Sequence, residues 1–168
     1  KVTKLEELSE AITAHSLNAA EKIRLDKQMV KKITVSIRTS PFVDKKDYYA
    51  NSKSIDLAIK TNDSIELIKQ ALFILKNIYR KGYKYQKAGI ILSGLEDVNS
   101  YDKNLFSKIR NEIKREKLMK AIDYANARYG RNSLSIAQAG LKKIWSGKKQ
   151  HYSKIDTASF RLLPTVRI

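Results

Sequence analysis

The sequence contains no cysteine, so neither a disulfide nor a thiolate metal site can form in this chain. Histidine is almost as scarce: His15 and His151 are the only two, and neither has a partner at a spacing suited to zinc or to a nucleophile relay. The six glycines are scattered and form no phosphate-binding loop. These absences remove the common catalytic centres, and the lack of cysteine fits a reducing compartment.

Long apolar runs are also missing from the sequence. No stretch approaches the roughly 20 apolar residues that a membrane-spanning helix needs, and the N-terminus lacks the apolar segment of a signal peptide. We therefore expect no membrane among the partners of this chain. The opening KVTKLEELSEAI has no methionine and resembles the start of a helix inside a longer polypeptide, so we expect a fragment.

Acidic residues are few compared with basic ones. The chain has 17 Asp and Glu against 34 Lys and Arg, a formal net charge of +17, which favours a polyanionic partner. The excess is uneven: residues 1–97 carry 18 basic and 12 acidic side chains, whereas 98–168 carry 16 and 5. The acids do not gather as a catalytic Mg²⁺ site requires, so we predict no catalytic residue and no metal site in this chain.

The spacing of apolar residues predicts an ordered series of elements. Thr3 and Glu6 have the spacing of a capping box, and Asn62 or Asp63 is expected to cap a later helix. The periods of 3.6 and 2 predict a helix at 4–26, strands at 32–40 and 54–60, a helix at 64–80 and a strand at 83–95.

This order indicates an α+β fold, a ferredoxin-like βαββαβ sheet whose first strand is absent from the fragment. Two helices would cover one face of the sheet and leave the other to water or a ligand. A helix ending at Gly130 and a short strand in NSLSIAQAG are expected beyond it. We predict three parts: a sheet domain at 1–97, a linker at 98–106, and a basic helical and irregular extension at 107–168.

One predicted strand places hydroxyl and cationic groups on a single face. Those groups belong to Lys32, Thr34, Ser36, Arg38 and Ser40. Hydroxyls can donate to phosphate oxygens, and cations add charge and release counterions. The face is therefore either a surface for a nucleic-acid backbone or an ordinary solvated strand face, and the sequence alone leaves both open.

Tyrosines supply a second possible signal for nucleic acid. Tyr83 and Tyr85 alternate on the last predicted strand, and Tyr48 and Tyr49 lie in a connector. Tyrosine rings can stack on bases. The segment lacks the aromatic pattern of an RNA-recognition motif, so packing is the favoured interpretation for Tyr83 and Tyr85.

Four segments carry a resemblance to a known family. VSIRTSPF, YYANSKS, YKYQKAGIIL and NLF occur in an order and at separations similar to those in bacterial UmuC-type polymerases of the Y-family, which perform translesion DNA synthesis. The resemblance implies a little-finger domain that grips template and primer beside a polymerase core. It also implies that Mg²⁺ serves the full-length polymerase through carboxylates upstream of Lys1, and that no cofactor belongs to this fragment.

The resemblance implies roles for particular residues. Arg38, Thr39 and Ser40 match family positions that contact DNA phosphates, and Lys87 matches the final-strand pattern. Together with the strand face described above, the predicted DNA-binding set is Lys32, Thr34, Ser36, Arg38, Thr39, Ser40 and Lys87.

A second set of residues resembles the family peptide that binds the ring-shaped sliding clamp. Asn104, Leu105 and Phe106 fit its last three positions, while Asp102 and Lys103 replace the usual glutamine and leucine. The region after it resembles an extension associated with the processed UmuD-like subunit and the RecA filament. The implied setting is the bacterial cytoplasm, at the nucleoid, during the SOS response to DNA damage.

Two other functions remain open from the sequence. The chain could be a non-catalytic protein-interaction module for the clamp, UmuD or RecA, with incidental DNA contact. A free-standing RNA-binding protein is the third hypothesis.

Overall fold

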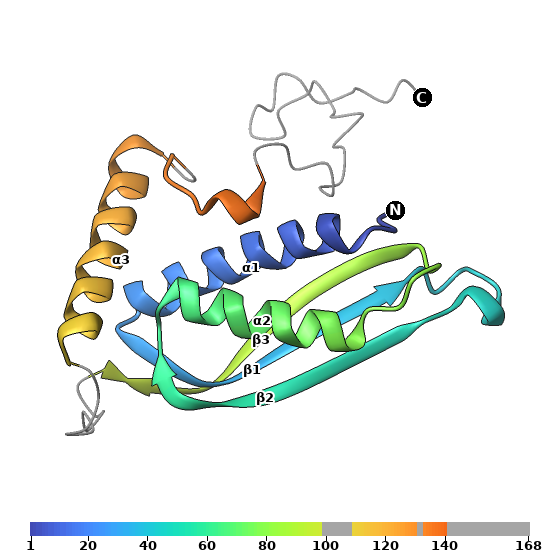
Figure 1. The fold of residues 1–168 in the computed structure, drawn as a ribbon, viewed down its shortest axis with the longest axis horizontal. Coiled ribbons are helices and arrows are strands. Elements are labelled where there is room, and N and C mark those ends of the chain that lie inside the picture. Colours follow the sequence, from blue (N-terminus) through green and yellow to red (C-terminus); the bar gives the residue numbers. More distant parts are fainter. Residues whose placement is uncertain (99–108, 131–132, 141–168) are drawn as a thin grey trace, which may run out of the picture.

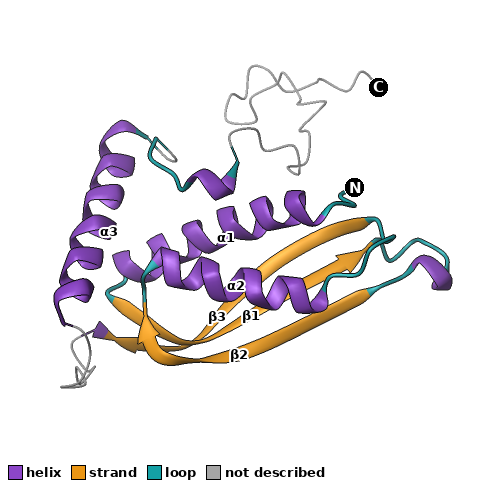
Figure 2. Ribbon diagram, viewed as in Figure 1, coloured by secondary structure: helices purple, strands orange, loops and turns teal. Residues whose placement is uncertain are grey.

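A computed structural model describes residues 1–98, 109–130 and 133–140 (Figure 1). Its helices are α1 (Leu5–Leu25), α2 (Ser64–Ile78) and α3 (Ile109–Tyr129), with short 3₁₀ turns at Lys45–Asp47 and Ala137–Ala139. Its strands are β1 (Gln28–Thr39), β2 (Ala50–Thr61) and β3 (Tyr85–Asp97). Figure 2 shows the strands as one layer, with α1 and α2 side by side across it and α3 near one end. No helix in the described part of the chain is long and apolar enough to cross a membrane.

The sheet is antiparallel, with strand order β2-β1-β3. The α+β class and the order helix, strand, strand, helix, strand are as predicted. One detail differs from a ferredoxin-like sheet without its first strand, in which a gap would separate the last strand from the other two. Here β1 is central and hydrogen-bonds β3 directly, from Gln28 to Thr39. This described sheet therefore has no vacant position between its strands.

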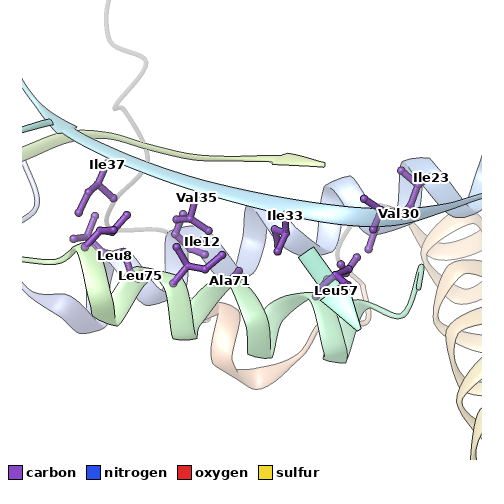
Figure 3. Packing of buried hydrophobic residues seen from close by; sticks show 14 of the residues in the cluster. Leu8, Ile12, Ile23, Val30, Ile33, Val35, Ile37, Leu57, Ala71 and Leu75 are labelled. Atoms are coloured by element: carbon purple, nitrogen blue, oxygen red, sulfur yellow. The ribbon is translucent and has the colours of Figure 1, made fainter. Parts of the chain in front are cut away.

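The core forms between β1 and the two covering helices. Successive residues of a strand point to opposite faces, so Ile33, Val35 and Ile37 all face the helices, and all three are buried. They pack in one cluster with Leu8 and Ile12 of α1 and Ala71 and Leu75 of α2 (Figure 3). Each large aliphatic side chain buried here contributes about 1.5–3 kcal/mol relative to an exposed one.

The start of α1 differs from the predicted capping box. The N-cap residue is Lys4, and no side chain caps the helix. Val2 instead exchanges two backbone hydrogen bonds with Tyr85, of 2.9 and 2.8 Å, which holds the preceding segment extended along β3. Thr3 is therefore not the cap. The cap predicted for α2 is confirmed at Asp63, whose Oδ1 accepts a hydrogen bond from the backbone N–H of Ile65 at 2.8 Å.

The tyrosines at the end of the sheet pack against one another, as favoured from the sequence. Tyr85 is buried and Tyr83 half-buried, and the ring centroids of Tyr49 and Tyr83 lie 4.9 Å apart. The Tyr85 hydroxyl donates to the carbonyl of Arg80 and accepts from its N–H, both at 2.9 Å. Burial raises the pKa of Tyr85, so its neutral form is the one that the fold holds.

Two ion pairs connect the last helix to the rest of the domain. Arg24 Nε and Nη2 donate to the two carboxylate oxygens of Asp123, both at 2.7 Å. Arg115 Nε lies 2.6 Å from the carboxylate of Asp63, and Met119 is buried. The strand predicted in NSLSIAQAG is wrong for residues 133–140. That segment has no strand partner, and its 3₁₀ turn packs beside α1 instead, with Ala139 buried.

Candidate nucleic-acid interface

The face of the sheet that the helices leave uncovered carries the predicted polar set of β1. Lys32, Thr34, Ser36 and Arg38 alternate with the buried residues of the strand and so share this outer face. The side chains of Lys32 and Arg38 are exposed, and those of Thr34 and Ser36 are half-buried between neighbouring strands. The structure therefore brings these four residues together, as the spacing predicted.

The neighbouring strands extend the hydroxyl surface on both sides of β1. The register places Ser54 of β2 opposite Thr34 and Ser52 opposite Ser36, and it places Ser93 of β3 opposite Lys32. The hydroxyl oxygens of Thr34 and Ser54 lie 2.8 Å apart in a hydrogen bond. The sequence analysis missed these three serines. The pairing of the strands and their register decide which residues share a face with β1, and the sequence pattern does not contain that information.

Two cations face each other near one end of this surface. Arg38 and Lys87 are direct register partners on β1 and β3, and both are exposed. They border an open groove of about 630 Å³, lined by Ser36, Ile37, Arg38, Ala50, Asn51, Ser52, Lys87, Ala88 and Gly89. No acidic side chain is among these lining residues. The groove is therefore positive, and its polar floor can donate hydrogen bonds to an anionic oxygen.

Gly89 lines the groove without placing a side chain in it. It lies opposite Ser36 in the register, and a Cβ at this position would have the Ser36 Oγ, 3.8 Å away, as its only close neighbour. The fold therefore has space for a side chain that the sequence does not place there. A bare backbone in the outer-face register row next to the two cations lets a ligand approach the strand closely.

Lys32 differs from the other cations of the face, because Nζ lies 3.5 Å from the carboxylate of Asp56. Both side chains are well exposed, and such surface pairs contribute at most about 1 kcal/mol. A phosphate can compete for this lysine, but Asp56 reduces the positive potential around it. Arg38 and Lys87 are thus the main cationic pair of the surface.

Thr39 and Ser40 do not share the outer face with Arg38. Both side chains are buried, with relative exposures of 1% and 6%. Thr39 Oγ1 accepts from the N–H of Tyr49 at 3.0 Å, and Ser40 Oγ accepts from the N–H of Phe42 at 3.3 Å. The structure gives these hydroxyls a role in closing the turn after β1. Phosphate contact by these two residues stays a prediction from sequence, and the interface is built here on the exposed members of the set.

The remaining site predictions concern the clamp peptide and metal binding. Asn104, Leu105 and Phe106 lie outside the described residues, so the clamp peptide stays a prediction from sequence. Among the side chains that the structure describes, no three His, Asp or Glu gather closely enough to hold a metal ion.

The described residues define a two-layer α+β domain, with two helices on one face of the sheet and a hydroxyl and cationic surface on the other. Comparison with known proteins then gives the family. Residues 1–105 match the C-terminal domain of the impB/mucB/samB family, and residues 116–166 match a domain of unknown function (DUF4113). The chain belongs to the impB/mucB/samB family, as the resemblance of its motifs predicted.

Individual relatives align along the whole chain. The protein UmuC of Salmonella typhimurium is 33% identical over 167 residues, which are 99% of this chain and 40% of the relative. ImpB of Salmonella typhimurium is 31% identical and MucB of Escherichia coli 32% identical, each over 168 residues, all of this chain and 39% of the relative. The chain thus spans about two fifths of the length of these curated relatives.

Proposed function

We propose that this chain is the DNA-gripping and partner-docking C-terminal region of an error-prone Y-family translesion DNA polymerase that acts in the SOS response to DNA damage. The observation that carries the proposal is the positive groove that Arg38 and Lys87 border on the hydroxyl-rich outer face. Its position within the matched family domain, at residues 1–105, adds independent support.

The chemistry of the face suits a nucleic-acid backbone better than base edges. Hydroxyls and cations contact phosphates, which position a duplex without reading its sequence. Binding of this kind releases counterions and weakens steeply with salt. The covering helices lie on the opposite face, so α1 and α2 would stay free while DNA occupies the sheet (Figure 2).

The partners and the catalytic chemistry of the parent protein belong to the same proposal. Asn104, Leu105 and Phe106 would bind the sliding clamp, and the extension at 107–168 would meet the processed UmuD-like subunit and the RecA filament. Mg²⁺-dependent polymerisation is assigned to the part of the relatives that this chain does not cover. The protein would work at the nucleoid in the bacterial cytoplasm.

The experiment compares two double variants that remove the same charge. Arg38→Ala with Lys87→Ala changes the outer face, and Lys69→Ala with Lys76→Ala changes exposed positions of α2 on the helix side. Affinity for a labelled primer-template duplex is measured across a salt series. The first variant is expected to lose affinity on the order of tenfold and to flatten the salt slope by about 1.8, since each lost phosphate contact removes roughly 0.9.

The control variant keeps its affinity within about twofold if the sheet face is the interface. Equal losses in both variants would mean that DNA responds only to net charge. Unchanged binding by the first variant would favour the alternative function, an interaction module for the clamp, UmuD or RecA with incidental DNA contact.

A further inference from the structure

Phe42 is the most exposed of the large hydrophobic side chains in the described residues. Its relative exposure is 95%, compared with 58% for Phe73 on α2. A phenylalanine in this setting contributes almost nothing to the hydrophobic core. The ring is therefore available for contact with a ligand or partner.

The turn that presents Phe42 is held by buried groups. Ser40 is buried, and its hydroxyl accepts the hydrogen bond from the N–H of Phe42. Thr39 and Tyr49 close the base of the loop, since the Thr39 N–H donates to the Tyr49 carbonyl at 2.9 Å and the Tyr49 N–H donates to the Thr39 hydroxyl. Pro41, between Ser40 and Phe42, has a backbone φ that its ring fixes. The backbone at Phe42 is therefore anchored while its ring points away from the core.

The loop lies at the end of the candidate interface. It joins β1 to β2, and the last register row of the outer face before it consists of Ala50, Arg38 and Lys87. Figure 1 shows this loop, with its short 3₁₀ turn, projecting past the ends of the covering helices. A strand of nucleic acid that leaves the groove at this end would pass the loop next.

The loop offers aromatic surface rather than charge. Residues 41–49 contain two lysines, Lys45 and Lys46, and two aspartates, Asp44 and Asp47, so their net charge is zero. Phe42 is joined there by Tyr48, which is 46% exposed. A bare aromatic ring beside a phosphate-binding surface can bind the flat face of a base, and such stacking tolerates any sequence.

We propose that Phe42 stacks on an unpaired base of the nucleic acid whose backbone lies in the groove that Arg38 and Lys87 border. This inference rests on the proposed function and adds a second kind of contact to it. The sheet face would bind the duplex backbone through charge and hydroxyls. The loop would contact a single-stranded nucleotide next to that duplex through its aromatic ring.

The test uses the full 168-residue chain and two labelled DNAs that share one duplex, one blunt and one with a single-stranded overhang. Fluorescence anisotropy gives the affinity of the parent chain, Phe42→Ala, Phe42→Trp and Phe73→Ala. Phe73 is the matched control, because it is an exposed phenylalanine on the helix side of the domain. Equal thermal unfolding midpoints verify that no variant has changed the fold.

Phe42→Ala is expected to weaken binding to the overhang DNA about fivefold or more, the lower limit for one base-aromatic stack, with less than about a twofold change for blunt DNA. Its salt slope stays that of the parent, since no charge is removed. Phe42→Trp keeps the overhang affinity, and Phe73→Ala changes neither.

An equal loss on both DNAs would overturn the inference, because the ring would then act on the duplex and not on an unpaired base. No loss on either DNA would also overturn the inference. The exposed ring would then be better explained by contact with an apolar pocket of a protein partner. In both cases the proposed function stands, provided that the parent binds DNA in a salt-dependent manner. A parent that binds neither DNA overturns both proposals.

Discussion

At the scale of single residues, two neighbours at the end of β1 have different roles. Arg38 is exposed on the outer face, whereas Thr39, the next residue, is buried. The register against β3 shifts between them: Arg38 pairs with Lys87, and Thr39 pairs with Tyr85. Thr39 thereby meets Tyr49 and closes the turn that carries Phe42.

Thr39→Val tests the structural role of this buried hydroxyl. Valine keeps the shape but cannot accept the hydrogen bond from the Tyr49 N–H, so we expect the free energy of unfolding to fall by about 1–2 kcal/mol. Thr34→Val is the control, because the Thr34 hydroxyl shares a hydrogen bond with the Ser54 hydroxyl at the exposed outer face. Urea denaturation measures both changes. A loss of DNA affinity in Thr39→Val without a loss of stability would instead support phosphate contact by Thr39.

The residues that sequence could predict are those inside a regular alternation. Lys32 to Arg38 follow the period of two without a break, and the structure places them on one face as expected. Thr39 and Ser40 lie past the register shift, where the alternation no longer says which way a side chain points. Ser52 and Ser54 belong to an edge strand that is polar on both faces around Lys53, so no hydrophobic period marks its true start at Ala50.

At the scale of elements, α3 depends on contacts that local sequence patterns do not contain. Arg24 and Asp123 are 99 positions apart, and their bidentate pair joins the end of α1 to α3. The same guanidinium also donates to the carbonyl of Asn62 and the hydroxyl of Ser64, both at 2.8 Å. One arginine therefore connects α1, the start of α2 and α3.

Arg24→Met should loosen α3 more than the sheet. The change leaves the Asp123 carboxylate without its bidentate partner, and we expect a loss of about 2–3 kcal/mol. This loss of stability is smaller than for a fully buried pair, because the Asp123 side chain is 21% exposed to solvent. Amide hydrogen exchange should accelerate in Ile109–Tyr129 more than in β1. Lys120→Met, which removes only an exposed pair with Glu116, should stay within about 0.5 kcal/mol. Equal acceleration in both regions would contradict this separation.

At the scale of the whole molecule, the net charge of +17 acts against compactness. The described part of the chain holds few ion pairs, and no acidic side chain is among the described residues that line the groove beside Arg38 and Lys87. Salt should relieve this repulsion, and so should a bound polyanion. The two routes predict opposite salt dependences, which separates a general charge effect from specific DNA binding.

We expect the unfolding midpoint of the free chain to rise between about 20 and about 200 mM salt, as the Debye length falls from about 20 Å to about 7 Å. With excess primer-template DNA the midpoint should instead be highest at low salt, because a ligand present at about 100 times its dissociation constant adds about 2.7 kcal/mol. The two curves should converge at high salt, where counterion release no longer favours the complex. Thermal denaturation followed by circular dichroism measures both. The Arg38→Ala, Lys87→Ala variant should show the rise of the free chain but a smaller gain from DNA, and an undiminished gain would place the DNA on another surface.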